Sequence, residues 1–183
     1  MIKNKMKLKI FFLIFIIAAT GLIFYQFSPQ SPQLEEKNQV SEIPKIGHYP
    51  ALDFNLKDVD GNEISLSSLK GNNLLLVFWT TWCGWCTKEK PILKEFVNDY
   101  QSQIKVIGIN IQEPKEVVKK HVEELQLNFP TLLDTTGEVA KSYNVFTHPS
   151  HFLVDKEGKI QATRPGFATR EDLENLVKII LEE

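Results

Sequence analysis

The sequence predicts an α/β fold, with a central mixed β-sheet flanked by helices on both faces. Two continuous apolar runs, Asn73–Trp79 and Ile104–Ile111, are typical of strands covered on both sides. Helical periodicity follows each run, and strand–helix–strand units favour a parallel core. The segment 150–163 reads as strand, Gly158 turn and strand, so an antiparallel hairpin joins this core.

The remaining elements follow from turn, capping and periodicity signals. Asp60-Gly61 lies between two short alternating runs within 52–69, which predicts an N-terminal β-hairpin extension. The segment 129–134 is expected to be a short strand, and Pro114 and Thr169 are expected to begin helices. Apolar positions at helical spacing predict three helices. The first has Ile92, Leu93, Phe96, Val97 and Tyr100, and a short penultimate one has Val139, Ala140 and Tyr143. The last has Leu173, Leu176, Val177, Ile180 and Leu181.

The amino-terminal segment predicts a membrane anchor. Residues 1–9 carry four lysines and form a basic stub, and residues 10–27 carry no formal charge. As a helix the uncharged run would extend about 27 Å, close to the hydrocarbon thickness of a bilayer. The lysine flank places the amino terminus in the cytoplasm and the rest outside. The alternative is a cleaved signal peptide ending near Ala18-Ala19-Thr20.

Residues 28–47 have three prolines and no apolar period, and we expect a flexible linker there. A single domain of ordinary size then spans 48–183. All 23 acidic residues but only 17 of the 21 basic ones follow Phe27, which gives this part a formal charge of −6. That balance suits a soluble domain and argues against nucleic acid as a partner.

Cys83 and Cys86 are the only cysteines of the chain, and they stand between the first apolar strand and its helix. The amino terminus of a helix favours negative charge, so Cys83 is expected to form a reactive thiolate. Side chains three positions apart on a first turn lie close enough to close a disulfide after a modest adjustment. The spacing therefore predicts a pair that cycles between dithiol and disulfide.

The cysteine pair has two other interpretations. A structural disulfide across so short a loop would remove little entropy from the unfolded chain. A metal site could combine the cysteines with His148 and His151, but 61 residues separate Cys86 from His148, against about 12–15 in a zinc finger. A copper- or zinc-binding module stays open as the less favoured alternative.

The segments FWTTWCGWCTKEKP (78–91) and HPSHFLVDKEGKI (148–160) resemble the thioredoxin superfamily, in its membrane-anchored TlpA/ResA-like branch. The resemblance implies a thioredoxin-like fold and a thiol–disulfide oxidoreductase without a cofactor. It also implies that Cys83 is the nucleophile and Cys86 the resolving thiol, and that Pro149 is a cis-proline facing them. We assign Trp82, Trp85, His148 and Pro149 to substrate binding.

The departures from the family pattern bear on mechanism. Thioredoxin has a buried aspartate where this chain has Val77, whereas Glu89 matches a glutamate that TlpA/ResA-like proteins place beside the active site. Glu89 is therefore expected to be a general base or acid for Cys86, with a solvated helix charge as the alternative. Trp85 replaces the usual proline, and a protonated His148 would further favour a thiolate, so both changes tend toward a more oxidising protein.

The expected function is exchange of disulfides with proteins outside the cytoplasm. Expected substrates are exported thiol proteins, for example apocytochrome c. The resemblance favours the reducing direction, and a thiol oxidase is the alternative. A reductase there needs electrons from a membrane-embedded thiol carrier, because the compartment lacks the reductants of the cytosol. Expected partners are thus disulfide-bearing exported proteins, this carrier and, through residues 10–27, membrane lipid.

Overall fold

The computed structural model describes residues 49–181. The predicted basic stub, membrane anchor and linker at 1–9, 10–27 and 28–47 lie outside these residues. Within 49–181, none of the helices combines the length and the apolar character that a bilayer crossing requires.

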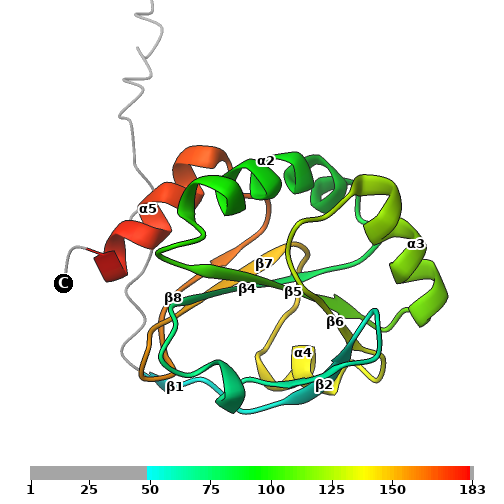
Figure 1. Ribbon diagram of the computed structural model, residues 1–183, viewed down its shortest axis with the longest axis horizontal. Helices are drawn as coiled ribbons and strands as arrows, with labels where there is room; N and C mark the ends of the chain where they lie inside the picture. The colour runs from blue at the N-terminus through cyan, green and yellow to red at the C-terminus, as the bar shows by residue number, and fades with distance from the viewer. Residues whose placement is uncertain (1–48, 182–183) are drawn as a thin grey trace, which may run out of the picture. The chain divides into compact units, whose positions relative to one another are not determined.

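The described residues form one eight-stranded sheet, in the order β1-β8-β7-β4-β5-β6-β2-β3, with helices packed against it (Figure 1). The strands are β1 (Tyr49–Pro50), β2 (Asn55–Asp58), β3 (Glu63–Ser65), β4 (Leu74–Trp79), β5 (Lys105–Ile111), β6 (Thr131–Asp134), β7 (Ser150–Val154) and β8 (Lys159–Pro165). The helices are the 3₁₀ turn η1 (Ser67–Leu69), α2 (Gly84–Tyr100), α3 (Lys115–Leu125), α4 (Glu138–Ser142) and α5 (Arg170–Leu181).

Strand β4 lies at the centre of the sheet and all six of its residues are buried. It runs parallel to β5 on one side and antiparallel to β7 on the other, while β5 and β6 are parallel. Successive side chains of a strand point to opposite faces. Leu74, Leu76 and Phe78 accordingly join the apolar cluster on one face, and Leu75 and Val77 join the cluster on the other. This double burial explains the uninterrupted apolar run.

Helices cover both faces of the sheet, as the sequence predicts. Helices α2 and α5 lie together on one face and α4 lies on the opposite one (Figure 1). Leu93 and Phe96 of α2 and Leu173 of α5 belong to the cluster of Leu75 and Val77. Ala140 of α4 belongs to the cluster of Leu74, Leu76 and Phe78. The two clusters hold β4 firmly between them, which fixes the position of the segment that follows Trp79.

The thioredoxin-like core and the N-terminal hairpin extension are both confirmed. Strands β2 and β3 are antiparallel, and β2 adds to the sheet beside β6. The sequence did not indicate β1, a two-residue strand that pairs with Ile160 and Lys159 of β8. Two residues are too few to show a periodicity, and only the pairing with β8 makes this segment a strand.

Candidate active site

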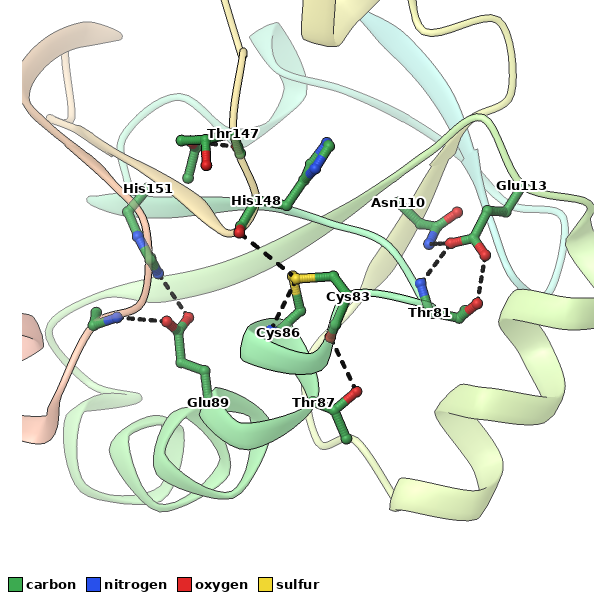
Figure 2. The surroundings of a disulfide bond; sticks show 12 residues. Thr81, Cys83, Cys86, Thr87, Glu89, Asn110, Glu113, Thr147, His148 and His151 are labelled. Carbon is green, nitrogen blue, oxygen red and sulfur yellow. Dashed lines mark hydrogen bonds and ion pairs between the residues drawn. A yellow bond between two sulfur atoms is a disulfide. The ribbon is translucent and has the colours of Figure 1, made fainter.

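The cysteine pair lies where β4 has ended and α2 begins. Cys83 is the residue that caps α2, with extended backbone angles, and its sulfur accepts the backbone N–H of Cys86 over 3.1 Å. Cys83 and Cys86 are joined by a disulfide (Figure 2). A free N–H of a helix's first turn that points at sulfur stabilises a thiolate there. The local structure therefore suits Cys83 to the role of nucleophile.

The two sulfurs differ in access to solvent. Cys83 is 8% exposed and Cys86 only 2%. Around them stand two exposed tryptophans, Trp82 at 72% and Trp85 at 57%. The Trp82 ring meets the His148 ring edge-on at 5.7 Å, and Trp85 packs near Phe167 at 5.5 Å. Exposed aromatic rings on residues next to the cysteines in the chain thus form a rim beside the pair.

The loop before β7 faces the disulfide. The peptide bond between His148 and Pro149 is cis, and the carbonyl oxygen of His148 lies 3.6 Å from the sulfur of Cys83 (Figure 2). Burial lowers the pKa of His148, and Glu113 partly opposes this. Beside the disulfide, burial thus works against the protonated imidazole that would favour a thiolate.

Glu89 lies behind the disulfide, and it is fully buried rather than solvated. Its Oε1 is 2.7 Å from Nε2 of His151, and its Oε2 accepts the backbone N–H of Ala168 over 2.7 Å. Glu89 and Cys86 line the same small cavity, with Val77 and Pro149 among its other walls. The carboxyl group is thus held in place beside the cavity that Cys86 also lines.

The segment that leads from β4 into the cysteine pair is tied to a second carboxylate. Thr81 donates its backbone N–H to Oε2 of Glu113 over 2.6 Å and its hydroxyl to Oε1. Asn110 donates to the same carboxylate over 2.7 Å. Glu113 follows β5, so these bonds connect the loop before Cys83 to the neighbouring strand (Figure 2).

A buried amine completes the surroundings of Cys86. Lys90 is 3% exposed, and its Nζ lies 3.5 Å from the centroid of the Trp79 ring. No hydrogen-bond partner is found for this Nζ among the described residues. Burial lowers the pKa of Lys90 to about 7, although Glu113 and Glu89 attract its charge. Lys90 also lines the cavity that Cys86 and Glu89 share.

Sequence reasoning did not assign a role to Glu113, Lys90 or the pairing of His151 with Glu89. Glu113 follows a buried strand at the same sheet edge as the cysteines, and this position was a usable signal. The sequence presents His151 only as a candidate metal ligand, through its spacing from His148. Within residues 49–181, no group of three or more His, Cys, Asp and Glu side chains is placed to hold a metal ion.

Comparison with known proteins agrees with this site. The model of the AhpC/TSA family matches residues 48–163. The thiol-disulfide oxidoreductase ResA of Bacillus cereus is 33% identical over 181 residues, which cover 97% of this chain and 98% of that protein. The sporulation thiol-disulfide oxidoreductase A of Bacillus subtilis is 33% identical over 161 residues, which cover 86% and 90%.

A solved structure gives the same result for the fold. The pneumococcal exposed lipoprotein thioredoxin of Streptococcus pneumoniae has a TM-score of 0.64 and 29% identity, with 69% of this chain and 98% of that chain covered. The resemblance found in the CxxC and cis-proline segments is confirmed. The protein is a thioredoxin-like thiol–disulfide oxidoreductase of the ResA type, and the chain belongs to the AhpC/TSA family.

Proposed function

We propose that this protein reduces disulfides of exported proteins from a membrane tether, through Cys83 and Cys86. The observation that carries the proposal is the disulfide at the start of α2, whose more exposed sulfur lies beside Pro149 within a rim of exposed aromatic rings. This arrangement gives a protein disulfide access to one sulfur while the other stays covered.

The reaction begins with the reduced pair. The thiolate of Cys83, stabilised by the N–H of Cys86, attacks one sulfur of the substrate disulfide. A bond forms between Cys83 and that sulfur, the substrate S–S bond breaks, and the second substrate sulfur leaves with the electron pair as a thiolate. The result is a mixed disulfide between Cys83 and the substrate.

Resolution needs a second thiolate. Cys86 is 2% exposed, so its proton has little access to water. Glu89 lines the same cavity and is the carboxylate we assign as the base that receives this proton. The Cys86 thiolate then attacks the sulfur of Cys83, which re-forms the internal disulfide and releases the reduced substrate. Two electrons have passed from the pair to the substrate.

Substrate binding is assigned to Trp82, Trp85, His148 and Pro149. The two tryptophans expose large apolar surfaces, and such surfaces on a soluble domain mark contact sites. The backbone of the His148–Pro149 segment lies beside the reactive sulfur, where an extended peptide could pair with it. Peptides that carry a cysteine between apolar residues fit this rim best.

The setting proposed is the outer face of the membrane, with residues 10–27 as the anchor and a membrane-embedded thiol carrier as the electron donor. Apocytochrome c is one exported thiol protein that could be the substrate. The name of the pneumococcal relative, an exposed lipoprotein, supports the location, and the ResA name of the Bacillus relative supports the activity.

The test is insulin reduction by the full-length protein with dithiothreitol as electron donor, together with the equilibrium potential against glutathione. We expect turnover that is lost in Cys83→Ser, and a potential below that of the glutathione couple. Turnover that survives in Cys83→Ser would contradict the enzyme assignment. A potential near that of strong oxidants, about −120 mV, would instead indicate a thiol oxidase.

A further inference from the structure

His151 and Glu89 form a hydrogen-bonded pair of ionisable side chains in the interior of the domain. Both side chains are buried, at 0% and 1% exposure, although they are 62 residues apart in the sequence. His151 lies on β7 and Glu89 on α2, to one side of the cysteine pair (Figure 2). Ionisable side chains are almost never buried this completely without a partner, because water no longer stabilises their charge.

The hydrogen bonds fix the number of protons in this pair. Nδ1 of His151 lies 3.1 Å from the carbonyl oxygen of Arg164, and a carbonyl oxygen only accepts, so Nδ1 carries a proton. Nε2 lies 2.7 Å from Oε1 of Glu89, which requires one further proton between these two atoms. The pair is therefore either an imidazolium with a carboxylate, or a neutral imidazole with a carboxylic acid.

The neighbouring groups favour the ionic form. Oε2 of Glu89 accepts the N–H of Ala168 over 2.7 Å, and such a bond stabilises a carboxylate. On the same helix, the Lys90 amine attracts negative charge at Glu89. The guanidinium of Arg164, from β8, is bound to Asp172 of α5 at 2.6 Å, so its charge is already compensated. The cysteine pair carries no charge as a disulfide.

We propose that His151 is a positioning residue whose imidazolium keeps the buried Glu89 carboxylate charged and correctly oriented to receive the proton of Cys86. The inference rests on the proposed role of Glu89 in resolution. His151 touches neither sulfur nor substrate, and it acts only through the carboxylate.

The resolving step then balances as follows. The S–H bond of Cys86 breaks and its proton passes to Glu89, which becomes a carboxylic acid beside the imidazolium. The Cys86 sulfur forms its bond to Cys83, and the bond from Cys83 to the substrate breaks with its electron pair leaving on the substrate sulfur. Glu89 finally returns its proton to solvent or to the departing thiolate. His151 neither gains nor loses a proton.

The experiment separates attack from resolution in the full-length protein. Reduced protein is mixed with an aromatic disulfide that releases coloured thionitrobenzoate. The first release reports attack by Cys83, and the second reports resolution by Cys86. Both phases are followed from pH 5 to 9 in the wild type, Glu89→Gln, His151→Gln and the double variant. Glutamine keeps a donor for Glu89 but cannot carry the positive charge.

We expect His151→Gln to leave the first phase unchanged and to slow the second at pH 6 to 7. The loss should exceed about tenfold and stay below ~10⁴-fold, the upper end of general-base assistance. The second phase should recover as the pH rises, because an isolated buried carboxyl group needs a higher pH to ionise. The double variant should resolve no more slowly than Glu89→Gln alone.

The outcomes distinguish the inference from the function on which it rests. Wild-type resolution in Glu89→Gln would overturn the role of the base itself. Slow resolution in Glu89→Gln with a wild-type pH profile in His151→Gln would overturn only the role of His151. Equal slowing of His151→Gln at every pH, in both phases, would mark a purely structural residue and would also overturn it.

A measurement on the wild type covers the case in which His151→Gln does not fold. Nitrogen-15 spectra of the histidines, assigned by replacing the other three in turn, report which ring nitrogens of His151 carry protons. We expect both nitrogens to be protonated at pH 7. An unprotonated Nε2 at that pH would mean a neutral pair, and the proposal would be wrong.

Discussion

At the scale of single residues, burial of the Lys90 amine lowers the stability of the domain. Its amine lies against the Trp79 ring without a hydrogen-bond partner among the described residues, and burial lowers its pKa from 10.5 to about 7. A lysine that binds its proton less tightly when folded than when unfolded makes stability depend on pH. The contact with the indole face offsets only part of the cost.

We expect Lys90→Met to stabilise the domain at pH 7 by about 1–3 kcal/mol, because it removes an unsatisfied buried amine and retains the apolar stem. Between pH 7 and about 10 the unfolded wild type holds more protons, so wild-type stability should rise with pH and the difference should shrink. Urea unfolding at several pH values measures both effects. Lys88→Met, an exposed neighbour that lies over Trp85, is the control and should show neither.

The second prediction at this scale concerns the order of reactivity of the cysteines. In the reduced protein, iodoacetamide should modify Cys83 first, at a pH well below the ~8.5 at which a free thiol ionises. The cause is the N–H of Cys86 that points at its sulfur, together with the greater exposure of Cys83. Peptide mapping after brief labelling measures the order. Preferential modification of Cys86 would reverse the two roles.

How far the sequence could predict the site depends on the distance over which its parts interact. Cys83, Cys86 and Glu89 share one helix, so their spacing alone placed them together. The full burial of Glu89 was not predictable in this way, because its partners His151 and Ala168 come from 62 and 79 residues away. No local pattern encodes such a pair.

At the scale of elements, the start of α5 is the part that connects the sheet, the last helix and the site. The side chain of Asp172 accepts bonds from the backbone and hydroxyl of Thr169 and pairs with Arg164 of β8. Burial raises the pKa of Asp172, but these bonds outweigh it and hold the pKa below 3.8. Because these bonds fix the start of α5, they also position the preceding Ala168, whose N–H donates to Oε2 of Glu89.

We expect Asp172→Ala to destabilise the domain by about 1–2 kcal/mol at pH 7, since it removes a helix cap and the partner of Arg164. A carboxyl group with a lowered pKa contributes stability above its unfolded value of about 3.9, and the contribution is lost as the pH falls through the folded value. The variant and the wild type should therefore converge as the pH falls below the lowered folded pKa of Asp172. Urea unfolding measures the difference, and Glu171→Ala on the same turn is the exposed control.

The elements themselves were largely predictable, because each has a period of its own. The buried runs of β4 and β5 and the apolar positions of α2 and α5 appear in the structure where the sequence indicates them. The pairing of strands that are far apart in the sequence was harder to predict. Strand β1 pairs with β8 and β2 pairs with β6, and no local periodicity specifies these contacts.

At the scale of the whole molecule, the disulfide links catalysis to stability. The oxidised and reduced proteins differ in their free energy of unfolding. By thermodynamics this difference equals the difference in reduction potential of the cysteine pair between the folded and unfolded states, where ~30 mV corresponds to ~1.4 kcal/mol. If the protein is a reductant, its folded state must favour the disulfide. We therefore expect the oxidised form to unfold at a higher urea concentration than the dithiol form. A more stable dithiol form would indicate an oxidant.

The remaining prediction concerns the full chain in a cell. Expressed in a bacterium, the protein should fractionate with the membrane, because residues 10–27 carry no formal charge and follow a basic stub. Protease added to the outside of spheroplasts should release the domain by cutting after residue 27. A soluble product that begins near Gly21 would show instead that a signal peptide is removed.

The two edge strands of the sheet, β1 and β3, affect whether neighbouring copies of the domain aggregate at high local concentration. Strand β3 has three residues and begins with Glu63, and β1 contains Pro50, which has no N–H to offer a neighbour. Short strands that carry charge or proline discourage pairing with a second sheet, the first step of aggregation. Copies concentrated on a surface can therefore collide edge to edge and separate again without joining their sheets.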